Sequence, residues 1–176
     1  MNVHLKPQDV VVLLKLVAIG SSSWTYSGLA RELGMSASEV HAAIVRAQSA
    51  RLYADVLRTV MHPNLFEFIV HGVRYAFAAE AGAPAWGIPT AHAAPPLNGI
   101  IVADEPLPPV WPTASGTTHG VSVTPLYRSV PYAAEHDPEL YGLLVCVDAL
   151  RIGRVRERTA ATEVLRAKIL GEEAAA

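Results

Sequence analysis

The sequence predicts an α+β fold that is mainly α-helical, and three observations favour it. Apolar residues recur at the three- and four-residue spacing of amphipathic helices within residues 1–77. Prolines gather in residues 81–118, where they oppose long helices and central strands. Helical patterns then return in residues 137–170. At 176 residues, 51% of them hydrophobic, the chain has ample material for a core.

These patterns divide the chain into three parts. Residues 1–77 form a first, helical domain, and residues 78–136 form a proline-rich extended segment with short strands. Residues 137–170 form C-terminal helices, which we expect to contact a partner or a second copy of the chain.

The first helix is predicted to begin at Pro7, because the missing amide proton of proline costs nothing in a first helical turn. Apolar residues then recur at helical spacing until Gly20 ends the element: Val10, Leu13, Leu14, Val17 and Ala18. Three serines follow. Trp24 is expected to fill the junction behind them, and the alternative is that it stacks on a ligand or a base.

Residues 25–52 predict two short helices joined by a tight turn. Thr25 can cap the first helix, and Gly34 follows that helix where a left-handed residue is usual. Ser36 and Glu39 have the spacing of a capping box, which predicts the start of a second helix. Each helix has one apolar face, made by Leu29, Ala30 and Leu33 in the first and by Val40, Ala43, Ile44 and Ala47 in the second. This arrangement is typical of a helix-turn-helix.

The segment resembles the DNA-binding half of MarR-type and related winged-helix regulators. The resemblance lies in Trp24-Thr25-Tyr26, Leu29-Ala30, Leu33-Gly34 and Ser36-x-Ser38-Glu39-Val40, and it covers about the first third of the chain. A fainter likeness is to the helix-turn-helix antitoxins of abortive-infection and other toxin–antitoxin systems. The resemblance implies that residues 1–77 are a winged helix-turn-helix domain.

In such a domain the second helix lies in the major groove, and its first residues meet the base edges. Ser38 and His41 can hydrogen-bond there, and Ala42 and Val45 can meet thymine methyl groups. Phosphate contacts are expected from hydroxyl groups near the first helix and from nearby arginines. The full predicted DNA-binding set is Thr25, Tyr26, Ser27, Arg31, Ser36, Ser38, His41, Ala42, Val45, Arg46, Arg51 and Arg58. Because this face has few basic residues, we expect a homodimer that places two copies on successive grooves.

The rest of the N-terminal part gives weaker patterns. Val56, Thr59 and Val60 suit one short strand of a wing, and Asn64 can cap a following helix with Leu65 and Ile69 inside. Residues 73–77 fit either a continued helix or a strand.

Residues 81–118 are expected to form an extended arm that packs on the body, with a short strand at residues 99–102. Trp86 and Trp111 make the arm too apolar for a solvated linker. The arm either covers the core or holds a partner, and the sequence favours neither. Residues 119–126 alternate as a short strand.

Asp137 and Pro138 predict the start of a helix, followed by residues 139–150, which are apolar on nearly all sides. A bend at Ile152 and Gly153 leads to a last helix over residues 154–170. Its inner side is expected to carry Val155, Thr159, Thr162, Leu165 and Ile169.

Charge is distributed unevenly along the chain. Residues 1–77 carry seven Lys and Arg against five Asp and Glu, whereas residues 78–150 carry one against seven. Residues 151–170 carry six basic and two acidic side chains. Because phosphate neutralisation supplies much of the affinity for nucleic acid, the two basic ends are the expected contact regions.

We expect no enzyme, no cofactor and no metal site. The seven histidines form no short-spaced ligand pair, the single Cys146 has no cysteine partner, and no phosphate loop or nucleophile elbow is present. The lone cysteine and the lack of a long apolar run or secretory pattern favour a cytoplasmic protein without membrane contact.

Two functional hypotheses follow. The first is a sequence-specific, double-stranded-DNA-binding transcriptional regulator, a dimeric repressor, with the antitoxin-like partner of a toxin–antitoxin or phage-defence operon as one form. The alternative is a winged-helix module that binds a partner protein, such as a toxin, without contacting DNA.

Overall fold

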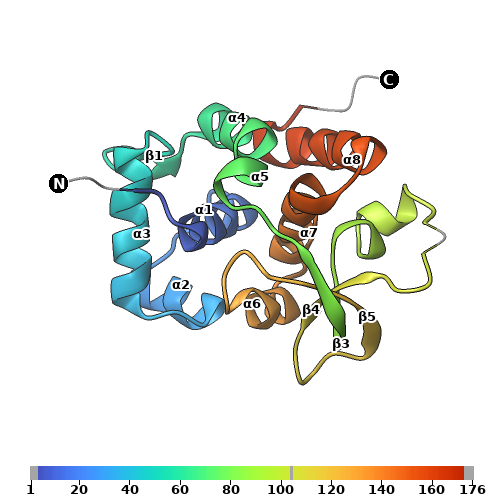
Figure 1. Ribbon diagram of the computed structural model, residues 1–176. Coiled ribbons are helices and arrows are strands. Elements are labelled where there is room, and N and C mark those ends of the chain that lie inside the picture. Colours follow the sequence, from blue (N-terminus) through green and yellow to red (C-terminus); the bar gives the residue numbers. More distant parts are fainter. Residues whose placement is uncertain (1–3, 104, 173–176) are drawn as a thin grey trace.

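The fold is α+β and mainly α-helical, with 55% of residues in helices and 14% in strands. The computed structural model describes residues 4–103 and 105–172. Figure 1 shows the N-terminal helices on one side of the molecule and the small sheet with the C-terminal helices on the other. Helix α1 (Pro7–Ile19) lies between these two sides and is buried along most of its length.

The described residues of the N-terminal part form five helices and one short hairpin. Helices α2 (Tyr26–Leu33) and α3 (Ala37–Ser49) pack on α1, and both apolar faces predicted from the sequence are buried. Strands β1 (Tyr53–Ala54) and β2 (Thr59–Val60) form an antiparallel pair. Helices α4 (His62–His71) and α5 (Val73–Ala76) follow, so residues 73–76 are helical.

Asn64 does not have its predicted role. Helix α4 begins at His62, two residues earlier than expected, with Met61 at the cap position. The Asn64 side-chain amide instead donates to the Arg51 carbonyl at 2.7 Å, which ties α4 to the end of the α3 segment. Pro63 fits this earlier start, because proline is favoured in the first turn of a helix.

The proline-rich region folds into a three-stranded sheet rather than an extended arm. Strands β3 (Ala81–Pro89), β4 (Pro109–Pro112) and β5 (Thr118–Val123) each pair with the other two, which closes the sheet on itself. Strand β3 pairs with β5 over residues 81–87 and with β4 only over residues 87–89. Over most of its length β3 therefore pairs with a single strand. A strand paired on one side tolerates proline, because the missing N–H can lie on the unpaired side.

Of the two strands expected in this region, one is absent and one is present. Residues 99–102 form no strand: Gly99 ends the short 3-10 helix η2 (Leu97–Gly99), which follows η1 (Ala91–Ala93), and residues 100–102 lie in the connection from β3 to β4 outside any helix or strand. The β5 strand begins at Thr118 and ends at Val123, close to the predicted residues 119–126. At Gly120 a β-carbon would lie 2.0 Å from the Pro108 carbonyl oxygen, so the closed sheet requires glycine there.

The C-terminal part is helical as predicted, with one additional helix. Helix α6 (Val130–His136), which the sequence analysis did not predict, precedes α7 (Pro138–Ile152). Asp137 caps α7 by accepting a hydrogen bond from the Leu140 amide at 3.0 Å, which confirms the predicted start. Helix α8 (Val155–Leu165) continues into a π-helical turn, η3 (Arg166–Leu170).

The predicted inner side of the last helix is correct only in its second half. Leu165 and Ile169 are buried, whereas Val155 is 69% exposed and Thr159 is also exposed. Val155 and Thr159 line an open pocket together with residues of α4, α5 and α7 such as Val70 and Leu150, so open space lies against them.

An ion-pair cluster centred on the buried Lys15 joins the two sides of the molecule. The Lys15 ammonium group on α1 lies 2.6 Å from carboxylate oxygens of both Glu32 on α2 and Asp137 at the start of α7. These two carboxylates raise the pKa of Lys15 against the opposing effect of its burial. The N-terminal helices are therefore fixed to the C-terminal helices at this point.

Two further observations concern the described residues as a whole. Cys146 is buried within α7, as expected for a small apolar side chain, and burial raises the pKa of its thiol to about 12. Among the helices of the described residues, none combines the length and the apolar character needed to cross a lipid bilayer.

Candidate nucleic-acid interface

The start of α2 and the turn after it follow the predicted pattern. The Thr25 hydroxyl accepts a hydrogen bond from the Gly28 amide at 3.0 Å. Gly34 has φ 63° and ψ 35°, a left-handed conformation that favours glycine. A β-carbon there would also lie 3.0 Å from the Tyr132 ring of α6, so the turn is packed against the C-terminal part.

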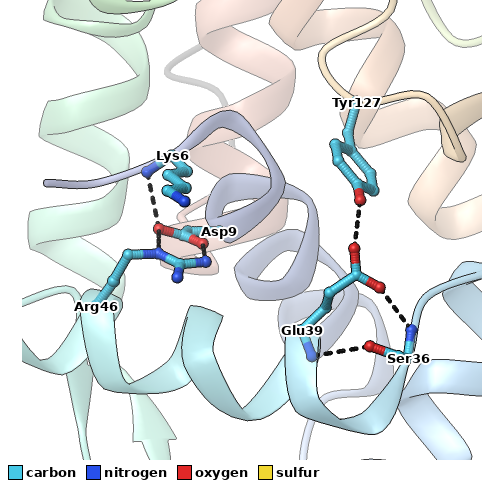
Figure 2. Close-up of polar contacts among 6 residues, drawn as sticks. All are labelled: Lys6, Asp9, Ser36, Glu39, Arg46 and Tyr127. Atoms are coloured by element: carbon cyan, nitrogen blue, oxygen red, sulfur yellow. Dashed lines mark hydrogen bonds and ion pairs between the residues drawn. The ribbon is translucent and has the colours of Figure 1, made fainter.

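The capping box at the start of α3 is formed as predicted and is extended by a residue from outside the segment. The Glu39 amide donates to the Ser36 hydroxyl at 3.1 Å, and the Ser36 amide donates to Glu39 Oε2 at 2.8 Å. Figure 2 shows the Tyr127 hydroxyl reaching Glu39 Oε1, at 2.7 Å. The hydrogen bonds from the Ser36 amide, Tyr127 and the Ser36 hydroxyl lower the pKa of Glu39 from 4.5 to about 2.

The outer face of α3 is open to solvent. Ser38, His41 and Val45 are exposed, and Ala42 between them is half-buried. Figure 1 places α3 along one edge of the molecule, with α2 at one end and the β1–β2 hairpin at the other. The four residues predicted to meet base edges therefore share one accessible helix face.

An aromatic row runs from the connector before α2 to this face. The Trp24 and Tyr26 rings meet edge to face at 5.3 Å, and the Tyr26 ring lies 5.3 Å from the His41 ring. The guanidinium group of Arg58 lies over the Trp24 ring at 4.7 Å. Trp24 is half-buried, as expected for a junction residue, and it links the hairpin to the start of α2.

The hairpin presents two arginines and an apolar tip. Arg51 and Arg58 are exposed, with positive φ values of 59° and 48° that place them at turns. Val56 is 97% exposed and Leu57 is 74% exposed at the tip between the two strands. The single predicted strand is in fact a pair of two-residue strands, and Val56 lies in the turn.

No family model, no curated protein and no solved structure matches the chain. The geometry of its own residues therefore carries the functional argument.

Arg46 does not lie where a phosphate contact requires it. Its guanidinium group forms two hydrogen bonds to the carboxylate of Asp9 on α1, at 2.8 Å and 2.6 Å. Figure 2 shows this pair, with the Lys6 amide also donating to Asp9. The Arg46 side chain is only 15% exposed and Asp9 is fully buried, so we remove Arg46 from the DNA-facing set.

The remaining predicted residues are accessible to different degrees. Thr25, Ser27 and Ser36 are exposed, although the hydroxyls of Thr25 and Ser36 accept the capping hydrogen bonds. Tyr26 is half-buried in the aromatic row. Arg31 is exposed on α2, and its carbonyl accepts a hydrogen bond from Tyr132 at 3.3 Å.

One basic side chain near this surface was not predicted. Arg128 has a 77% exposed side chain and lies 3.5 Å from Glu39 at the start of α3. It is 89 residues away in sequence, in the connection from β5 to α6, so no local pattern indicates its position.

Within the described residues, no group of three or more His, Cys, Asp or Glu side chains could hold a metal ion.

Proposed function

We propose that the chain is a winged helix-turn-helix protein that binds double-stranded DNA through α3 and acts as a dimeric transcriptional repressor. The observation that carries the proposal is the exposed face of α3, formed by Ser38, His41, Ala42 and Val45. A helix bound in the major groove needs such a face, flanked by elements that reach the two phosphate backbones. Here α2 and the β1–β2 hairpin flank it.

The proposed contacts divide into base and backbone contacts. Ser38 and His41 carry hydrogen-bonding groups near the start of α3, the part that meets base edges in helix-turn-helix proteins. Ala42 and Val45 supply apolar contact for thymine methyl groups. The backbone contacts come from exposed arginines around α3: Arg31, Arg51, Arg58 and Arg128.

Four arginines per copy support a dimer. Exposed acidic residues lie in the same region, Glu32 on α2 and Asp55 on the hairpin, and they reduce the local positive charge. A single copy should therefore bind weakly, and two copies on successive grooves would combine their phosphate contacts.

The test measures binding to DNA from the region upstream of the chain's own gene, by fluorescence anisotropy at several salt concentrations. His41→Ala should weaken binding by about tenfold, the loss expected for one base-edge contact. His71→Ala is the matched control, because His71 is also exposed but lies on α4. Equal affinities of the two variants, or the absence of salt-sensitive binding, would contradict the proposal.

The hairpin tip favours a second candidate function, docking of a partner protein. Val56 and Leu57 are far more exposed than apolar side chains usually are, and adjacent exposed apolar residues mark interaction sites. A toxin or other product of a neighbouring gene is the partner that this function requires. Co-expression with that gene should give a complex that Val56→Asp with Leu57→Asp disrupts, while DNA binding through α3 is retained.

A further inference from the structure

The open pocket beside α8 is bounded by residues of four helices. Its volume is about 330 Å³, which lies in the range of small-molecule sites in proteins. Helix α8 contributes residues three or four positions apart, so one face of this helix lines the pocket: Val155, Arg158, Thr159, Thr162 and Glu163. The other lining residues come from α4, α5 and α7: Val70, His71, Arg74, Tyr75 and Leu150.

Two arginines in this pocket lack the partner that comparable basic side chains have. Among the described residues, the other Lys and Arg side chains that are buried or half-buried are all paired with a carboxylate: Lys15, Arg46, Arg151 and Arg166. Arg74 and Arg158 are half-buried, and no carboxylate of the described residues lies within ion-pair distance of either. A charge withdrawn from water is costly unless an opposite charge compensates it. The two guanidinium groups therefore favour an anion in the pocket that both of them line.

The hydrogen-bonding groups of the pocket are mainly those of the two arginines. Arg158 Nη1 donates to the Gly153 carbonyl at 2.9 Å, which holds this side chain near the start of α8. A guanidinium group has five N–H donors, so most of those of Arg158 remain for a ligand. The hydroxyls of Thr159 and Thr162 donate to carbonyls of their own helix. Arg74 and Arg158 are thus the residues that can donate to an anion from two sides, α5 and α8.

The pocket also offers apolar surface that is open to solvent. Tyr75 is 77% exposed and Val155 is 69% exposed, and both line the pocket. The Arg74 guanidinium group lies 5.4 Å from the centre of the Tyr75 ring, so a charged group and an aromatic group are adjacent. A ligand that carries an aromatic ring beside its anionic group can contact both, and covering the apolar surface is favourable.

A phosphate monoester fits the two arginines better than a carboxylate does. It carries about two negative charges at pH 8, and its three terminal oxygens can accept hydrogen bonds from two guanidinium groups. A carboxylate carries one charge, and its two oxygens are satisfied by one bidentate guanidinium group. Glu163 also lines the pocket, and its negative charge works against binding of an anion.

We propose that this pocket binds a small aromatic phosphate monoester. The phosphate group accepts hydrogen bonds from the guanidinium groups of Arg74 and Arg158. The aromatic ring lies against Tyr75 and Val155. Helix α8 lies on the opposite side of the molecule from α3 (Figure 1), so the site is separate from the proposed DNA-binding surface and does not depend on it.

The first test is isothermal titration calorimetry of the full chain with phenyl phosphate at pH 8. We expect a dissociation constant below about 1 mM. Inorganic phosphate lacks the ring, and benzoate has the ring with a single negative charge, so each should bind at least about fivefold more weakly. Absence of phenyl phosphate binding would overturn the proposal. Equal affinity for inorganic phosphate would overturn the contact with the ring, and equal affinity for benzoate would overturn the assignment of a phosphate.

The second test replaces the arginines one at a time. Arg74→Met and Arg158→Met should each weaken phenyl phosphate binding by at least about tenfold, because each removes charged hydrogen bonds to the ligand. Arg156→Met is the matched control, since Arg156 is exposed on the same helix and does not line the pocket. Equal affinities of the Arg74→Met and Arg156→Met variants would overturn the proposal.

Two further variants test the charge of the pocket without removing the Arg158 contact to Gly153. Thr159→Glu adds a carboxylate at an exposed position that lines the pocket and should weaken binding by about tenfold. Glu163→Gln removes a negative charge and should strengthen binding by about threefold. Unchanged binding in the Thr159→Glu variant, or weaker binding in the Glu163→Gln variant, would show that the anion does not lie in this pocket.

Discussion

Arg46 and Asp9 hold α3 against α1 through two parallel hydrogen bonds between a guanidinium group and a fully buried carboxylate. The pair crosses from the outer helix to the central one, so it sets how α3 projects from the molecule. The same contact that makes Arg46 inaccessible for the proposed DNA contacts positions the helix that carries Ser38 and His41.

Replacement of Arg46 should therefore reduce stability rather than act directly on DNA contacts. Arg46→Met leaves the Asp9 carboxylate buried without its ion-pair partner, and the free energy of unfolding should fall by roughly 3–5 kcal/mol. Chemical denaturation measures the change. The double variant Asp9→Asn with Arg46→Met should recover part of the loss, because the uncompensated charge is removed.

Arg31→Met is the matched control, since Arg31 is exposed on α2 and has no such buried partner among the described residues. It should change the free energy of unfolding by less than about 0.5 kcal/mol. Similar losses for the two arginine variants would show that the Asp9 contact does not stabilise the fold.

The Glu39 site should make stability sensitive to acid. Its pKa is lowered to about 2 in the folded chain, against an ordinary value of 4.5. The stabilisation is thus complete above pH 4.5 and is lost as the pH falls from about 4.5 towards 2. The melting temperature of the wild-type chain should fall across this range more steeply than that of Glu39→Gln.

Tyr127→Phe provides a partial version of the same change. It removes one hydrogen bond to Glu39 and leaves the two with Ser36, so its pH dependence should lie between those of the wild type and Glu39→Gln. Identical pH profiles for all three proteins would mean that another carboxylate controls the acid range.

The sequence predicted the caps of α2, α3 and α7 because each depends on residues within three positions of one another. It could not predict the Arg46–Asp9 pair, whose members are 37 residues apart. Helical periodicity places Arg46 outside the apolar face of α3, but it does not show that α1 brings a carboxylate to it. The contact between Arg128 and Glu39, which are 89 residues apart, could not be predicted for the same reason.

The middle of the chain was mispredicted for a different reason. Proline has no backbone N–H to donate, so it disfavours a strand that pairs with a neighbour on each side, as the central strands of an open sheet do. In the closed three-stranded sheet, β3 is paired on one side over most of its length, so Pro84 and Pro89 are accommodated. The sequence contains no local pattern that indicates such closure.

The salt dependence of the proposed DNA binding tests the role of the four exposed arginines Arg31, Arg51, Arg58 and Arg128. Each neutralised phosphate contributes about −0.9 to the slope of log K against log salt, so one copy using all four should give a slope near −3.6. Arg51→Ala should make the slope less negative by about 1 and should weaken binding to all sequences alike. Anisotropy titrations between low and moderate salt provide the slopes.

Arg156→Ala is the control for this prediction. Arg156 is exposed on α8, which Figure 1 shows at the opposite side of the molecule from α3. Its replacement should leave the slope unchanged. An equal change in slope for Arg156→Ala would instead place the basic C-terminal helix on the nucleic acid.

Outside the N-terminal part, Asp148 on α7 is the acidic residue whose substitution should reduce the stability of the fold most. It is 1% exposed, and its carboxylate accepts hydrogen bonds from Thr90, Trp111 and Arg151. Arg151 is nearly as buried and also donates to the carbonyls of Phe77 and Thr124. This cluster joins the sheet and its flanking loops to α7.

Asp148→Asn should lower the free energy of unfolding by roughly 3–5 kcal/mol, because it leaves the Arg151 charge buried and turns an amide donor towards other donors. Thr90→Val removes only one hydrogen bond and should cost about 1 kcal/mol. Denaturation followed by Trp111 fluorescence, with Trp24 and Trp86 replaced by phenylalanine, reports on the cluster itself. Asp55→Asn at the exposed hairpin is the control, and an equally small effect of Asp148→Asn would mean that neutral hydrogen bonds suffice to join the sheet to α7.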